Sequence, residues 1–143
     1  MAYEKLELLI NGKWRQGGSN KSEAVYNPAT SEIIGDLPHA SKTDLDEALE
    51  SSAQAFKTWR NVPALNRQKI IENACRILEN RADEVAENLT KEMGKPLAES
   101  KMELAVGLDV LRWYGEEGKR AYGRIIPSRM PGMSQTVIKD PIG

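Results

Sequence analysis

A long run of helical hydrophobic spacing, interrupted by a glycine–proline junction, constrains this fold most. From Ala64 to about Met93, apolar residues recur every three or four positions opposite a charged side, which is typical of an amphipathic helix. Gly94 suits the left-handed C′ position that ends a helix. Pro96 suits the first position (N1) of the next helix, where a missing amide costs nothing. We therefore predict one continuous helix over 64–93 and another from Pro96 to about Tyr122.

The second of these helices combines apolar spacing with internal glycines, each of which costs up to about 1 kcal/mol relative to alanine. We expect the glycines to allow close approach of another backbone. They are Gly107, Gly115 and Gly118. The predicted apolar face consists of Leu97, Leu104, Leu108, Leu111 and Tyr114.

Short strands are predicted at both ends of the chain. Asn11-Gly12 between apolar stretches indicates a two-residue hairpin turn, because type I′ turns need positive φ at both central residues. Residues 24–26 and 33–37 predict two further strands, and the opening segments together predict a small antiparallel layer. Residues 124–127 and 135–139 predict a last pair of strands around a turn that contains proline and glycine.

A further helix is predicted between the first strands and Pro63. Ser41 and Asp44 have the spacing of a capping box, in which each side chain accepts a backbone amide of the other residue. The helix should end before Pro63, because the residue preceding a proline is biased away from helical geometry. Its apolar face consists of Leu45, Ala48, Leu49, Ser52, Ala55, Phe56 and Trp59.

Composition excludes several classes of function. The chain has 20 Lys and Arg against 21 Asp and Glu, with the two signs interspersed and 6% aromatic residues, so we expect no nucleic-acid partner. The apolar runs are too short for a membrane-spanning helix, and residues 1–5 do not resemble a signal peptide. A single cysteine fits a reducing compartment, and we expect a cytoplasmic protein without a membrane partner.

None of the candidate catalytic residues has the surroundings that its chemistry needs. Cys75 lies mid-helix at the edge of the apolar face, so we interpret it as a core residue rather than a nucleophile. His39 could form a triad with Ser41 and Asp44 only on paper, and a loop histidine is the better interpretation. A single histidine excludes a multi-histidine metal site. We predict no catalytic, cofactor-binding or metal-binding residue in this chain.

Two further patterns are also better explained by local helix structure than by a catalytic or phosphate-binding site. Gly94-Lys95 lacks the preceding glycine and the following Ser or Thr of a phosphate-binding loop, and we expect Lys95 to cap carbonyls or face solvent. Glu116 and Glu117 are adjacent on a helix and cannot converge on one substrate atom, so we expect a solvated helix end.

An ordered set of motifs along nearly the whole chain resembles the N-terminal part of the NAD(P)-dependent aldehyde dehydrogenase superfamily. Each motif alone is weak evidence for the family, but their order and spacing are specific. Their sequences are most similar to those of the succinate-semialdehyde dehydrogenase branch. The motifs are Leu9-Ile10-Asn11-Gly12-Lys13-Trp14, Tyr26-Asn27-Pro28-Ala29-Thr30, Trp59-Arg60, Asn66-Arg67, Glu92-Met93-Gly94-Lys95-Pro96, Trp113-Tyr114 through Tyr122-Gly123, Ile126-Pro127 and Lys139-Asp140-Pro141-Ile142-Gly143.

The resemblance implies an α/β fold in which residues 1–143 supply short antiparallel strands plus three helices. Most of the Rossmann-like sheet, the nucleophilic cysteine, the catalytic glutamate and the cofactor motifs of that family are missing, and we expect the coding sequence to continue past Gly143. The resemblance also implies that residues 124–143 begin an oligomerisation arm, and that Val106-Gly107 lies near the mouth of the substrate tunnel in a complete enzyme.

A complete enzyme of this family would oxidise an aldehyde to a carboxylic acid. By that resemblance, a cysteine thiolate attacks the aldehyde, hydride passes to NAD or NADP, and a water activated by glutamate hydrolyses the acyl-enzyme. We expect the complete enzyme to be a homo-oligomer, and this chain alone to bind no cofactor and to be inactive. The alternative is a stand-alone helical interaction module that uses exposed helix faces or open strands.

Overall fold

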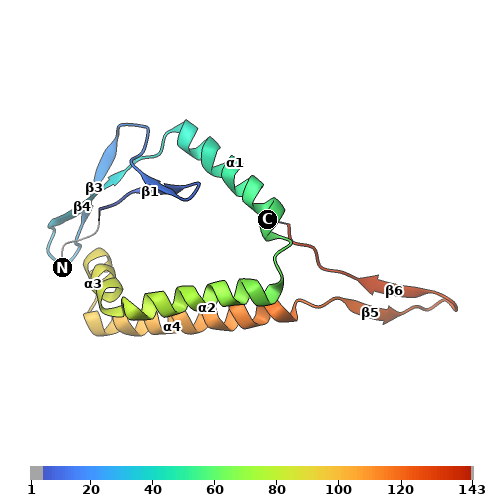
Figure 1. The fold of residues 1–143 in the computed structure, drawn as a ribbon. Coiled ribbons are helices and arrows are strands. Elements are labelled where there is room, and N and C mark those ends of the chain that lie inside the picture. The colour runs from blue at the N-terminus through green and yellow to red at the C-terminus, as the bar shows by residue number, and fades with distance from the viewer. Residues whose placement is uncertain (1–4, 143) are drawn as a thin grey trace.

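The chain forms an open frame in the computed structural model, which describes residues 5–142 (Figure 1). The small sheets and α1 make one side, the paired helices α2 and α4 make the other, and a β-hairpin projects from one end. Residues 1–4 and Gly143, to which the sequence interpretation also applied, lie outside the described residues. The elements are β1 Leu8–Ile10, β2 Lys13–Arg15, β3 Ser22–Tyr26, β4 Ile33–Pro38, α1 Lys42–Trp59, α2 Ala64–Asn80, α3 Ala82–Met93, α4 Leu97–Glu117, the 3₁₀ turn η1 Gly118–Arg120, β5 Arg124–Pro127 and β6 Ser134–Val137.

All the strands pair locally, each with its neighbour in sequence. The pairs β1–β2, β3–β4 and β5–β6 are antiparallel and form three separate two-stranded sheets among the described residues. Asn11 and Gly12 have φ angles of 51° and 72°, which confirms the predicted turn between β1 and β2. The prediction of one small layer in the opening segment was wrong in one respect, because the first four strands form two sheets.

The start of α1 is held by a carboxylate that joins three segments. Ser41 is the N-cap, and its hydroxyl accepts the Asp44 amide at 3.2 Å while Asp44 accepts the Ser41 amide at 2.7 Å, which confirms the capping box. Asp44 also accepts the Gly18 amide at 2.8 Å and lies 3.3 Å from the Arg15 guanidinium. Asp44 is therefore buried but fully partnered, as a buried charge must be.

The predicted continuous helix over 64–93 was wrong, since the structure has two helices there. Arg81 separates α2 from α3 with φ −112° and ψ 17°, and its amide bonds the Leu78 carbonyl at 3.0 Å in place of the usual fourth residue back. Asp83 and Glu84 lie in the first turn of α3, where acidic side chains favour a helix start. Residues 5–142 therefore contain four α-helices rather than the three that were predicted.

The junction between α3 and α4 agrees more closely with the prediction from the sequence. Gly94 ends α3 with φ 71°, as the predicted left-handed position requires, and the space beside its α-carbon is filled by Pro28. Pro96 lies at the N-cap rather than at N1, because its ψ of 142° is not helical. The two helices are also joined by a 2.8 Å hydrogen bond between the hydroxyls of Thr90 and the fully buried Ser100.

The core of the described residues is small, with one buried apolar side chain on each of β1, α2, α3 and α4. Within residues 5–142 the buried apolar side chains are Ile10, Cys75, Ala86 and Leu108. The predicted face of α4 is only partly covered, because Leu108 is buried while Tyr114 is 68% exposed. α4 ends at Glu117 and continues as η1 to Arg120, close to the predicted end at Tyr122.

The close packing predicted for the α4 glycines occurs at one of them. A β-carbon added to Gly115 would lie 3.3 Å from the Ile71 side chain of α2, whereas one added to Gly107 or Gly118 would meet nothing within 4 Å. α2 and α4 run antiparallel at this contact (Figure 1). Gly115 therefore sets how closely the two helices approach.

Replacing Gly115 with leucine should destabilise the chain, whereas the same change at Gly107 should not. Gly115→Leu would force α2 and α4 apart at Ile71, and overpacking of this kind costs about 1–3 kcal/mol. Gly107→Leu enters open space and gains up to about 1 kcal/mol of helix propensity. Midpoints of thermal unfolding followed by circular dichroism at 222 nm test this, and equal midpoints for the two variants would contradict it.

Asp44 should make the stability of the chain sensitive to acid. Hydrogen bonds from the Ser41 and Gly18 amides and from the Ser41 hydroxyl, helped by Arg15, lower the pKa of Asp44 from 3.8 to about 2. A carboxylate with a lowered pKa stabilises the folded state above pH 3.8, and this contribution is lost as the pH falls from 3.8 to about 2. We expect Asp44→Asn to melt earlier than the parent at pH 7 and to approach it below pH 3; a difference independent of pH would refute this role.

Candidate functional site

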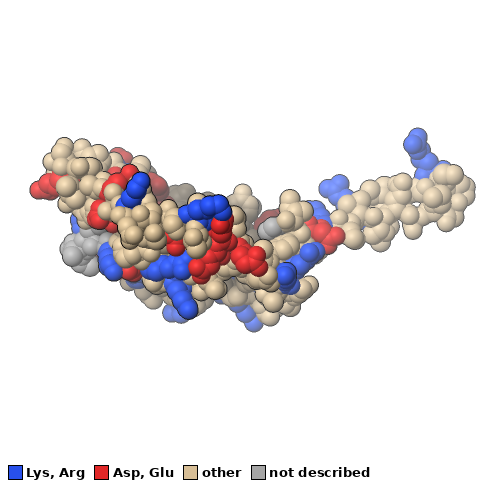
Figure 2. All heavy atoms as spheres, turned by 90° about the horizontal axis from the view of Figure 1, so that it is seen from above, with Lys and Arg blue, Asp and Glu red and all other residues tan. Residues whose placement is uncertain are grey.

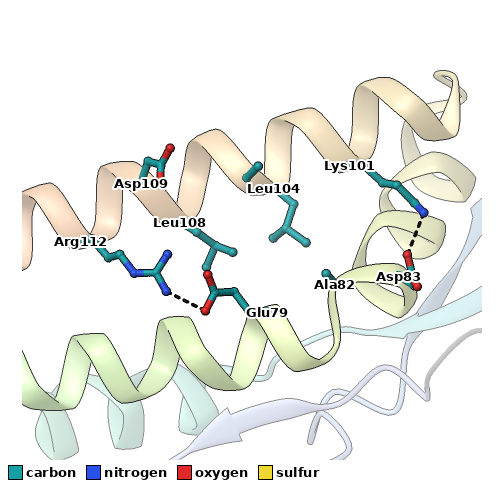
Figure 3. Close-up of a pocket in the computed structure, with 9 residues that line it drawn as sticks. Glu79, Ala82, Asp83, Lys101, Leu104, Leu108, Asp109 and Arg112 are labelled. Atoms are coloured by element: carbon teal, nitrogen blue, oxygen red, sulfur yellow. Dashed lines mark ion pairs between the residues drawn. The ribbon is translucent and has the colours of Figure 1, made fainter.

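A shallow cavity of about 270 Å³ lies at the meeting point of α2, α3 and α4 (Figure 3). Leu104 and Leu108 of α4 point from one side toward the end of α2. Two ion pairs bound this apolar centre, Arg112 with Glu79 at 2.7 Å and Lys101 with Asp83 at 2.8 Å.

The two ion pairs keep their members charged. The hydrogen bond from Arg112 lowers the pKa of Glu79, and the same bond raises the pKa of Arg112. The hydrogen bond from Lys101 likewise lowers the pKa of Asp83. A general acid or base works best with a pKa near the operating pH, and these carboxylates are shifted in the opposite direction. These ion pairs are therefore better suited to holding the helices together than to transferring protons.

Arg112 also links α4 to α2 at a second position. Its guanidinium lies 3.4 Å from Glu72, which is about two helical turns before Glu79 on the same helix. Asp109 lies at the rim of the cavity and points away from the other side chains (Figure 3). The sequence analysis did not single out Arg112, because a charge that faces a second helix has the same spacing as one that faces water.

Cys75 is placed in the core, which confirms that interpretation. It is a free thiol with 0% of its surface exposed, in the middle of α2. Its full burial differs from the predicted position at the edge of the apolar face. No substrate can reach this thiol in the described fold.

His39, Ser41 and Asp44 do not form a catalytic arrangement. The Ser41 hydroxyl and the Asp44 carboxylate are engaged in the helix cap, whereas His39 lies 3.5 Å from Glu23 of β3. The His39 amide bonds the Lys21 carbonyl at 2.8 Å, and this bond holds the end of β4. His39 is a loop histidine, as predicted.

The charged residues near the helix ends have local partners. Glu116 and Glu117 pair with Lys119 and Arg120 three residues later, which fits the predicted solvated helix end. The expectation for Lys95 was wrong, because its side chain is only 18% exposed and pairs with Glu103 of α4. Within residues 5–142, no group of three or more His, Cys, Asp or Glu side chains is placed to hold a metal ion. No helix in that range is long and apolar enough to cross a membrane.

Large apolar surfaces are exposed along the helices. α4 carries a second stripe, on positions that do not face α2, in which every side chain is at least 48% exposed: Met102, Val106, Val110 and Trp113. Leu45 and Leu49 on the predicted apolar face of α1 are also exposed. Val106 and Gly107, expected near a substrate tunnel, lie in open surroundings in this chain.

The total surface area gives this exposure a scale. The chain exposes 10974 Å², whereas a compact monomer of 15.9 kDa exposes about 7,400 Å². The projecting hairpin contributes to the excess, and its extension is largely uncharged in the view of Figure 2, whereas acidic and basic side chains intermingle on the helical body. Uncovered apolar faces of this extent are typical of surfaces that pack against further polypeptide.

Replacing Arg112 should release the pKa of Glu79. In Arg112→Met, the hydrogen bond that lowers this pKa is lost, and we expect the pKa of Glu79 to rise toward its ordinary value of 4.5. Arg120→Met is the matched control, because Arg120 pairs within its own segment with Glu117. Side-chain carboxyl NMR titrations measure both values. A Glu79 pKa that is the same in the two variants would show that the pair between the helices does not form.

Comparison with known proteins places this fold among oxidoreductases. The model of the Aldehyde dehydrogenase family matches residues 14–143. The 4-(hydroxymethyl)benzenesulfonate dehydrogenase TsaD1 of Comamonas testosteroni is 44% identical over 141 residues, which are 99% of this chain and 30% of that protein. The NADP(+) succinate-semialdehyde dehydrogenase GabD of Escherichia coli K12 is 34% identical over 96% of this chain and 28% of its own length.

Solved structures agree over nearly the whole chain. The succinate-semialdehyde dehydrogenase of Burkholderia pseudomallei superposes with a TM-score of 0.92 at 33% identity, over 97% of this chain and 29% of that one. An aldehyde dehydrogenase of Brucella melitensis superposes with a TM-score of 0.89 at 35% identity, over 94% and 28%. The chain thus spans about 30% of the length of the relatives it matches, and it corresponds to their N-terminal portion.

Proposed function

Because the chain belongs to the aldehyde dehydrogenase family, we propose that it forms the N-terminal scaffold of an NAD(P)-dependent enzyme that oxidises an aldehyde to a carboxylic acid. The observation that carries this proposal is the TM-score of 0.92 with a succinate-semialdehyde dehydrogenase over 97% of the chain. A semialdehyde is the substrate class that we favour, because several relatives at 33–38% identity carry semialdehyde names.

In this proposal the chain alone is inactive. Its one thiol is fully buried, and the carboxylates of Glu79 and Asp83 have lowered pKa values, so neither a nucleophile nor a general base is available. The cofactor, NAD or NADP, would be held by polypeptide beyond the part that this chain matches. A free cysteine that is buried fits a reducing compartment such as the cytoplasm.

Residues 124–143 would begin an arm through which complete subunits form a homo-oligomer. The hairpin of β5 and β6 projects from the helices, and Ile125 and Ile138 are 82% and 74% exposed. Its outer strand edges also carry unpaired backbone groups, which favour pairing with another strand.

The alternative, a stand-alone helical interaction module, has weaker support. Such a module would have to cover its own core, yet the chain exposes about one and a half times the area of a compact monomer. The uncovered stripe of α4 and the face of α1 are better explained by a further layer of the same enzyme.

An activity assay tests the proposal. The purified chain, succinate semialdehyde and either NAD or NADP should produce no reduced cofactor at 340 nm above the blank, because the chain has no accessible nucleophile. The full-length Escherichia coli relative, assayed in parallel, shows that the reagents support turnover. Turnover by the purified chain above the blank would overturn the assignment of inactivity.

A further inference from the structure

A second cavity, of about 570 Å³, lies where the end of α1, the beginning of α2, η1 and the segment after β6 meet. Its volume falls within the roughly 300–1,000 Å³ typical of small-molecule sites. Four of its lining side chains are cationic and come from four different segments: Arg60, Arg67, Lys119 and Lys139. Asp140 is the one carboxylate in the lining.

Three of the four cations of this cavity have no carboxylate partner among the described residues. Among residues 5–142, Arg81, Lys101 and Arg112 each lie within 3.0 Å of a carboxylate oxygen. In the same range, no carboxylate lies within ion-pair distance of Arg60, Arg67 or Lys139, and of the four only Lys119 is paired, with Glu116. The cavity therefore keeps a local positive charge in a chain whose net charge is −1.

Among these cations, Arg67 is the side chain that we expect to contact a bound anion. It is half-buried, and within the described residues its guanidinium donates one hydrogen bond, to the Val62 carbonyl at 2.6 Å. A half-buried cation without a counter-charge is unfavourable, so this side chain favours a bound anion. The first turn of α2, which carries Arg67 at its end, has no side-chain cap and no acidic residue, so the helix dipole adds to the positive potential.

Aromatic side chains line the same cavity. Arg60 stacks over the Phe56 ring, with its guanidinium carbon 5.2 Å from the ring centre, and this contact fixes one wall. Trp59, which is 43% exposed, provides an apolar surface beside the cations. We propose that this cavity binds a small organic anion, a carboxylate or related oxyanion with an apolar body, whose charged group faces Arg67 and whose body lies against Trp59.

Benzoate is a suitable probe, since it combines a carboxylate with a flat apolar ring. Titration into the ¹⁵N-labelled chain should shift the indole N–H resonance of Trp59 saturably, with Trp59→Phe used to assign it. Benzamide has the same ring without the charge and should bind about tenfold more weakly, because a charge-assisted hydrogen bond is lost. Acetate, which lacks the ring, should also bind more weakly than benzoate.

Variants locate the site. Arg67→Met should weaken benzoate binding about tenfold or more, for the same reason. Arg76→Met is the matched control, because Arg76 lies on the same helix but bonds Asn73 and does not line the cavity. Lys139→Met removes a second cationic side chain of the cavity, from a segment outside the helices. The proposal can therefore still be tested if the Arg67 variant does not fold. Equal affinities for benzoate and benzamide, or unchanged affinity in both Arg67→Met and Lys139→Met, would overturn the proposal.

Discussion

The antiparallel contact between α2 and α4 is the interaction on which the rest of this structure depends. Gly115 lets the α4 backbone approach Ile71 of α2, the helix that also carries the fully buried Cys75. Arg112 then joins the two helices at Glu72 and Glu79. Because few other side chains are buried, loss of this contact would leave α3 and η1 without support.

Local structure was predictable from the sequence wherever one or two residues determine it. The Asn11-Gly12 turn, the Ser41–Asp44 cap and the left-handed Gly94 are each fixed by backbone preferences that operate over four residues. The break at Arg81 was missed because no proline or glycine marks it. The acidic pair Asp83 and Glu84 was the available signal, since such residues favour the first turn of a helix.

Contacts between segments were less predictable, for a physical reason. The pairing of Arg112 with Glu79 and the bond between Thr90 and Ser100 depend on how two helices are set beside each other, which helical spacing does not determine. The prediction of which side chains are buried was wrong at Tyr114 for the same reason. Tyr114 has the spacing of a core residue, yet it is 68% exposed, because helical spacing does not tell which side chains another segment covers. The expectation that the chain holds no catalytic residue came from the sequence surroundings of Cys75 and His39, and it stays a prediction.

The multiple engagement of Asp44 has a consequence for how freely this sequence can vary. One carboxylate holds the loop at Gly18, the cap at Ser41 and the strand residue Arg15, so a change at any of these positions perturbs the others. The tip of the hairpin between β5 and β6 is the opposite case, because its residues are exposed and Gly132 meets no other segment. Mutational tolerance should therefore be low around Asp44 and high at the hairpin tip, where inserted residues would disturb no packing.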